Sequence, residues 1–125
     1  MLPYSLSFVD IETTGANPFS GRIIEIGIIK VENNQVVKTY NTLINPQVYI
    51  EQFIENLTGI TQNLLEDAPT FGQIKDEILE ILDGSIFVAH NVRFDYGFLR
   101  NEFKRFGHSF SAKHFCTVKL ARALY

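Results

Sequence analysis

Two acidic side chains interrupt an apolar segment near the start of the chain. Asp10 and Glu12 follow Ser5–Val9 within the stretch FVDIETTG, residues 8–15. Successive side chains of a strand point to opposite faces, so residues two apart share one face. Two carboxylates held side by side repel each other and lose hydration. A lone acid at a strand end often caps the following turn, but two acids on one face predict a bound cation.

A third acid follows another apolar segment. Asp95 comes shortly after Ser85–Ala89, in the first turn of a predicted helix, and precedes Phe98 and Leu99 by three and four positions. That spacing places it on the inward face of the helix. By itself, an acid at a helix start is explained by the helix dipole. Ligands of open α/β sheets bind beyond the carboxyl ends of strands, where we expect all three acids. Mg²⁺ commonly uses a few carboxylates plus a substrate phosphate, so the pattern predicts a divalent metal site.

Alternating strands and helices are expected to position these acids. Strands are predicted at Ser5–Ile11, Arg22–Val31, Gln35–Ile44, Ser85–Ala89 and His114–Cys116. Helices are predicted around residues 50–57, 71–82 and 93–106, with another from Thr117 onward. The second and third strands form a hairpin across Asn33-Asn34. The nearly continuous β-branched run of the second strand predicts burial on both of its faces.

Two of the helices have a predicted buried face. In the first, that face consists of Ile50, Phe53, Ile54 and Leu57. In the helix over residues 71–82 it consists of Phe71, Ile74, Ile78, Ile81 and Leu82. Thr70 and Gln73 predict a capping box at the start of this second helix, and Gly84 predicts its end.

Composition predicts one domain and no membrane segment. The chain has 125 residues, of which 46% are hydrophobic, enough for one core and too few for two domains. No apolar run approaches the roughly 18 residues of a membrane span, and the acids interrupt any signal peptide. Cys116 is the only cysteine, which favours the reducing cytoplasm. Formal charge is −8 over residues 1–92 and +5 over 93–125, so the basic part could attract a polyanion or be a solvated helix face.

At this point the sequence resembles a known family. FVDIETTG and VAHNVRFDYGFLR resemble the first two motifs of the DEDD-type (DnaQ-like) 3′–5′ exonucleases, which include the proofreading epsilon subunit of DNA polymerase III. NLTGIT, residues 56–61, resembles the segment that touches the terminal nucleotide in that family. The likeness covers essentially the whole chain, which is therefore interpreted as one exonuclease domain, residues 1–125.

The resemblance implies roles for individual residues. Asp10 matches the acid that bridges two metal ions, Glu12 a ligand of the metal that activates water, and Asp95 a ligand of the second metal. The ions would be two Mg²⁺ or Mn²⁺. Substrate-binding positions carried over in the same way are Thr13, Thr14, Gly15, Thr58, Gly59, Ile60, His90, Asn91 and Phe94. Without the resemblance, His90 would be interpreted as a structural histidine.

The family likeness also implies the fold and the reaction. The expected fold is ribonuclease-H-like, an α/β domain with a mixed five-stranded sheet and helices on both faces. The expected reaction is two-metal hydrolysis of phosphodiester bonds at a single-stranded 3′ end of DNA or RNA. Proofreading with a polymerase, or with other domains of a longer chain, is the expected setting.

The third motif of the family is missing. It is a histidine followed five residues later by an aspartate, whereas His108 and His114 are followed at that spacing by Lys113 and Lys119. Both histidines also lie too early in the chain. We therefore expect a domain truncated at its C-terminal helix, with weak activity or none.

Two other functions fit parts of the pattern. A non-catalytic module with the same fold could bind nucleic acid or a protein partner. A phosphatase or phosphotransfer domain similar to the haloacid dehalogenases could use Asp10 as its nucleophile, although the later lysine of that class is not evident.

Overall fold

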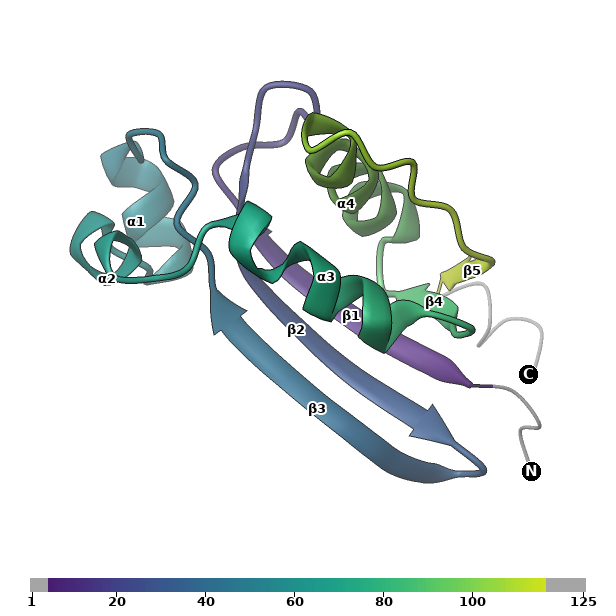
Figure 1. Cartoon of the computed structure of the whole chain (residues 1–125). Coiled ribbons are helices and arrows are strands. Elements are labelled where there is room, and N and C mark those ends of the chain that lie inside the picture. The colour runs from purple at the N-terminus through teal and green to yellow at the C-terminus, as the bar shows by residue number, and fades with distance from the viewer. Residues whose placement is uncertain (1–4, 117–125) are drawn as a thin grey trace.

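A mixed five-stranded sheet forms the centre of the molecule (Figure 1). The computed structural model describes residues 5–116. The strands are β1 (Leu6–Thr13), β2 (Ile23–Glu32), β3 (Gln35–Leu43), β4 (Ile86–Ala89) and β5 (His114–Cys116), in the order β3-β2-β1-β4-β5. β1, β2 and β3 pair antiparallel, whereas β4 and β5 continue the sheet in parallel. This confirms the predicted mixed α/β sheet.

Two helices cover one face of the sheet. They are α3 (Phe71–Leu82) and α4 (Val92–Arg105), and both lie in front of the strands in Figure 1. The helix expected from Thr117 lies outside the described residues, so the prediction of helices on both faces can be followed for one face only. None of the helices in residues 5–116 is long and apolar enough to span a membrane.

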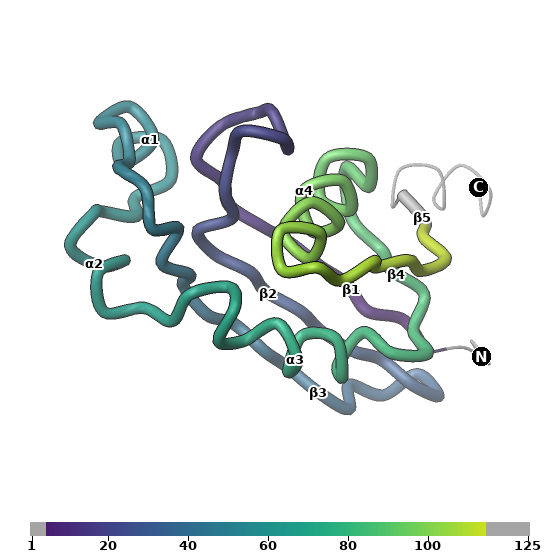
Figure 2. The backbone as a smooth tube through the Cα atoms, turned by 45° about the horizontal axis from the view of Figure 1, so that its top comes forward, coloured from purple at the N-terminus to yellow at the C-terminus, as the bar shows by residue number. Residues whose placement is uncertain are grey.

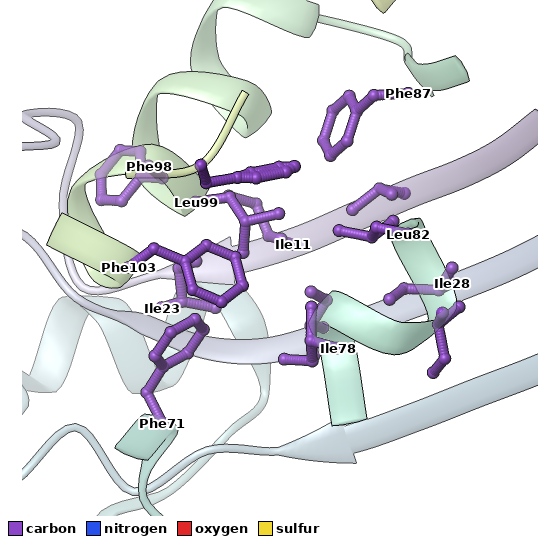
Figure 3. Close-up of a cluster of buried hydrophobic side chains, with 14 of the residues drawn as sticks. Ile11, Ile23, Ile28, Phe71, Ile78, Leu82, Phe87, Phe98, Leu99 and Phe103 are labelled. Atoms are coloured by element: carbon purple, nitrogen blue, oxygen red, sulfur yellow. The ribbon is translucent and has the colours of Figure 1, made fainter. Parts of the chain in front are cut away.

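The core lies between these helices and the sheet (Figure 3). Phe103 of α4 is fully buried and packs edge-on against Phe71 of α3, with ring centroids 5.0 Å apart. Ile11 of β1 and Ile28 of β2 belong to the same cluster and extend it along the sheet. The predicted inward face of α3 is confirmed at all five positions, because Phe71, Ile74, Ile78, Ile81 and Leu82 are buried.

The β2–β3 hairpin turns on two asparagines, as predicted. Asn33 and Asn34 have φ values of 53° and 63°, and Glu32 pairs directly with Gln35. A two-residue turn with both central residues in the left-handed region matches the right-handed twist of the strands. Asparagine tolerates that region better than most residues, which explains the pair at this point.

The prediction that β2 is buried on both faces is wrong. Ile26 and Ile28 point into the core and are buried, whereas Ile29 on the opposite face is 47% exposed. Phe8, its cross-strand neighbour on β1, is 37% exposed. A β-branched run indicates a strand, but it does not tell whether the second face is covered.

A small second hydrophobic cluster packs two short helices together, and in Figure 2 these helices lie near the end of β3 and apart from α4. It joins α1 (Gln52–Thr58) to α2 (Gln62–Glu66), a helix that the sequence did not reveal. The cluster consists of Ile24, Ile50, Ile54, Ile60 and Leu65. Phe53 and Leu57, which were predicted to be buried, are 58% and 78% exposed. Ile50 precedes the helix, so the four residues predicted as its buried face do not lie on one face of a single helix.

The start of α3 allows a local test of stability. Thr70 donates its backbone N–H to Oε1 of Gln73 at 2.9 Å, which is one half of the predicted capping box. Gln73→Ala should lower the free energy of unfolding by about 0.5–1 kcal/mol, because that donor loses its partner. Gln73→Glu keeps an acceptor at this position and should not destabilise the chain. Urea unfolding of both variants checks this, and an equal loss in both would contradict the capping role.

Candidate active site

Asp10 and Glu12 share one face of β1, as predicted, and this face is turned away from α3 and α4. Val9 and Ile11 are only 5% and 6% exposed, because their side chains enter the core beneath α3 and α4. Strand alternation then turns the two acids to the opposite face. Across β2, Asp10 lies opposite Gly27 and Glu12 opposite Glu25. The burial of the apolar residues thus determines where the carboxylates lie.

Asp95 reaches the same region from α4. β4 runs parallel to β1, and after two connecting residues the chain enters α4. Phe98 and Leu99 are fully buried, which directs the first turn of the helix inward. Asp95 is therefore only 7% exposed, and its carboxylate accepts a hydrogen bond from the backbone of Ile11 in β1.

The three carboxylates are not electrically independent. Burial and, as the second cause, the charge of Asp10 together raise the pKa of Asp95 from 3.8 to about 6. Backbone hydrogen bonds from Asp95 itself and from Ile11, together with the charge of His90, partly oppose that rise in pKa. The pKa of Glu12 is raised by burial first, then by the charges of Asp10 and Glu25. Asp10 is thus the shared neighbour of the other two acids.

The donor chemistry suits a hard divalent cation. Carboxylate oxygens are the ligands that Mg²⁺ and Mn²⁺ prefer. Within residues 5–116, no Lys or Arg forms an ion pair with Asp10, Glu12 or Asp95. In that same part of the chain, no three Asp, Glu, His or Cys side chains are gathered closely enough to hold one ion. The charge of Asp10 instead acts on each of the other two acids separately, on Glu12 and on Asp95.

Glu25 is an acid of this region that the sequence reasoning missed. It lies opposite Glu12 in the β1–β2 ladder, is half-buried, and raises the pKa of Glu12. The available signal was an acid inside the β-branched run RIIEIGIIKV. Only the strand register shows that it neighbours Glu12.

A groove of about 650 Å³ lies against the sheet, and of the three acids only Asp10 lines it. His90 and Asp10 both line it, so the structure brings these two predicted residues together. The other lining residues are Phe8, Val9, Gly27, Ile28, Ile29, Thr39, Tyr40, Asn41, Val88 and Ala89. Asn91 is exposed at the start of α4, and the half-buried ring of Phe94 packs on Phe98 with centroids 4.8 Å apart.

The turn after β1 uses its side chains internally. Thr13 donates its hydroxyl to the Gly15 carbonyl oxygen at 2.7 Å. Thr14 accepts from the Arg22 backbone N–H at 2.9 Å, and its own N–H donates to the Arg22 oxygen at 2.9 Å. Gly15 has no atom within 4 Å of the position a Cβ would take. A ligand could therefore approach the backbone at Gly15.

The second predicted substrate segment ends α1. Thr58 donates its hydroxyl to Ile54 O at 2.7 Å and accepts from the Ile60 N–H at 3.1 Å. Gly59 has φ +76° and open space on its Cβ side. Ile60 is only 6% exposed, with its side chain inside the small cluster formed by α1 and α2. The Ile60 side chain is therefore committed to packing, and Thr58 and Gly59 are the predicted positions of this segment that stay accessible.

Sequence comparisons identify relatives over nearly the whole chain. A family model described as Exonuclease (RNase T) matches residues 7–125. The PolC-type DNA polymerase III of Caldanaerobacter subterraneus subsp. tengcongensis is 40% identical over 93% of this chain. The 3′-5′ exonuclease DinG of Bacillus subtilis is 38% identical over 94% of it. The chain spans only 8% and 13% of the lengths of these two proteins.

Solved structures match the fold. A structure of exonuclease I without ligand superposes with a TM-score of 0.84 over 99% of this chain and 31% of its own, at 19% identity. Escherichia coli exonuclease I in complex with a dA16 oligonucleotide gives 0.84 over 98% of this chain and 30% of its own, at 20% identity. The ribonuclease-H-like arrangement predicted for the sheet is confirmed by this likeness.

Proposed function

Because the chain belongs to the exonuclease family, we propose that it hydrolyses phosphodiester bonds at the 3′ end of a single-stranded nucleic acid. The observation that carries the proposal is the position of Asp10. Its charge raises the pKa of Glu12, which lies on the same strand, and the pKa of Asp95, which lies on α4. DNA is the proposed substrate, since exonuclease I is seen in complex with a dA16 oligonucleotide and a relative is a DNA polymerase. A polymerase partner rests on the PolC-type relatives.

Members of the exonuclease family generally use divalent metal ions. In this chain Asp10, Glu12 and Asp95 would hold them, with Asp10 shared. Such ions, when bound, lower the pKa of a water nucleophile and neutralise charge on the phosphate.

The residues of the chain itself would position the substrate, and the three carboxylates supply the negative charge that attracts metal ions. Asp95 is buried, so its carboxylate is oriented by packing and by the backbone of Ile11. The open backbone at Gly15 and at Gly59 gives a terminal nucleotide two approaches to the acids. His90 lines the groove beside Asp10 and influences the charge of Asp95. These groups would orient the 3′ end. His90 has Asp95 five residues later, but both lie in the second motif, and neither His108 nor His114 has an aspartate at that spacing to complete the third motif.

A binding module with the same fold is the second candidate. It is favoured by the lack of a three-ligand cluster within residues 5–116. The two functions differ in one measurement. The module binds an oligonucleotide in Mn²⁺ without shortening it, whereas the nuclease produces a ladder of products, slowly.

We expect binding to depend on a free single-stranded 3′ end. A 5′-fluorescein-labelled oligonucleotide should bind at least about tenfold more tightly than a blunt duplex, because only a free end can reach Gly15 and Gly59. Its affinity should fall with salt, as phosphate contacts require. Fluorescence anisotropy in Mn²⁺ measures both effects.

The matched control is the same oligonucleotide with its 3′ end closed in a hairpin and its 5′ end free. Equal affinity for the open and the closed 3′ end would contradict the proposed polarity. Products shortened from the 5′ end would contradict it as well.

A further inference from the structure

One arginine holds the loop between β1 and β2. Arg105, in the last turn of α4, donates from Nη2 to the carbonyl oxygens of Phe19 and Gly21 at 3.0 Å and of Pro18 at 3.3 Å. These contacts join residues more than eighty positions apart in the chain. A planar guanidinium can serve several acceptors at once, which an ammonium group cannot do in the same geometry.

A buried glutamate orients that arginine. Glu102, one turn earlier on α4, is 4% exposed and accepts from Arg105 Nη1 at 2.6 Å. It also accepts from the backbone N–H of Ile23, the first residue of β2, at 3.3 Å. Burial raises the pKa of Glu102, and the nearby charge of Arg105 opposes that rise. The pair therefore ties α4 to the second half of the loop, through Arg105, and to the start of β2, through Glu102.

The loop so held leads directly into the candidate site. Its first residues are Thr14 and Gly15, the turn after the two acids of β1. At its far end Gly21 lies against α4, where an added Cβ would come within 2.9 Å of the Phe98 ring. Between them Phe19 is 77% exposed. Thr14 and Gly21 also donate backbone N–H groups to Arg22 O and Asn17 O. The second half of the loop is therefore tied to α4, the helix that carries Asp95.

We propose that Arg105 is a positioning residue for substrate binding, which holds the loop over residues 14–21 so that the Thr14–Gly15 backbone meets the 3′ end in register with Asp95. The inference rests on the proposed function, because it assigns a role in binding the same substrate. It differs from the simpler view that Arg105 is a phosphate contact. In the structure its guanidinium donates to loop carbonyl oxygens and to Glu102, and its side chain is only 25% exposed.

The test compares two neighbouring basic residues on the full chain. Arg105→Met and Lys104→Met each remove one positive charge from the last turn of α4, but Lys104 is exposed and makes none of the loop contacts. Amide hydrogen exchange at Thr14 and Gly21 reports loop order. Anisotropy with a 5′-fluorescein oligo(dT) in Mn²⁺ reports affinity and its dependence on salt.

Arg105→Met should accelerate exchange at Thr14 and Gly21 and weaken oligonucleotide binding. If the loop keeps its bound arrangement in about one molecule in ten, the apparent affinity falls about tenfold. The slope of log affinity against log salt should stay unchanged, whereas loss of a phosphate contact reduces it by about 0.7. Lys104→Met should leave exchange at both amides as in the wild type. Arg105→Lys should restore the charge but not the affinity, since a lysine cannot reach Glu102 and the loop carbonyls together.

Three results would overturn the positioning role. One is protected Thr14 and Gly21 amides in Arg105→Met, and another is full recovery of affinity in Arg105→Lys. The third is an affinity that is unchanged although the loop has opened, which would make Arg105 structural only. Failure of the proposed function looks different, because then the wild-type chain itself either binds no oligonucleotide or binds it without shortening it, whatever the exchange at Thr14 and Gly21.

Discussion

Asp10→Asn is expected to abolish divalent-metal binding and to lower any measured hydrolysis roughly 10²-fold or more, the scale on which lost electrostatic stabilisation acts. Among these three acids, Asp10 is the one whose charge raises the pKa of both others, Glu12 and Asp95. Its substitution therefore removes the carboxylate that neighbours both of them. Asparagine retains the shape and one oxygen. The variant should therefore fold like the wild type.

Thermal unfolding with and without Mn²⁺ measures the loss. A ligand at a hundred times its dissociation constant stabilises a folded protein by about 2.7 kcal/mol, so the wild type should melt at a higher temperature when Mn²⁺ is added. Asp10→Asn should show no such increase. Glu80→Gln is the control, because it removes one exposed carboxylate from α3, remote from these acids. An Mn²⁺ response that persists in Asp10→Asn would show that the metal site is elsewhere.

Asp95→Asn is expected to stabilise the metal-free chain at neutral pH. The pKa of this carboxyl rises from 3.8 to about 6 on folding, mainly because it is buried and then because Asp10 is near. The folded state thus holds the proton more tightly than the unfolded state. Stability contributed by the protonated form is fully present below pH 3.8 and is lost as the pH rises towards about 6. A rise in pKa of this size corresponds to roughly 1–3 kcal/mol.

Urea unfolding in EDTA across this pH range checks the sign. The advantage of Asp95→Asn over the wild type should be small near pH 4 and should reach its full size above about pH 7. In Mn²⁺ the order should reverse, because the wild type gains ligand stabilisation that the variant cannot. A difference that is independent of pH would mean that the substitution acts through packing and that the carboxylate is not strained by its surroundings.

The strongest predictions from the sequence concerned local periodicity. Alternation along β1 placed Asp10 and Glu12 on one face, and helical spacing placed Asp95 with Phe98 and Leu99. The inward face of α3 and the Asn33-Asn34 hairpin followed in the same way. Each of these features depends on neighbours within a few residues, and such constraints are written directly into the order of side chains.

Tertiary structure decided the features that depend on distant segments. Glu25 neighbours Glu12 only because β1 and β2 pair in one register. Phe53 is exposed and Ile60 is buried because α1 meets α2 on the side of Ile24. Arg105 reaches the loop carbonyls across more than eighty residues of sequence. An apolar or charged residue looks the same in a sequence whether or not another element covers it, so its partner becomes known only when segments far apart in the chain have packed together.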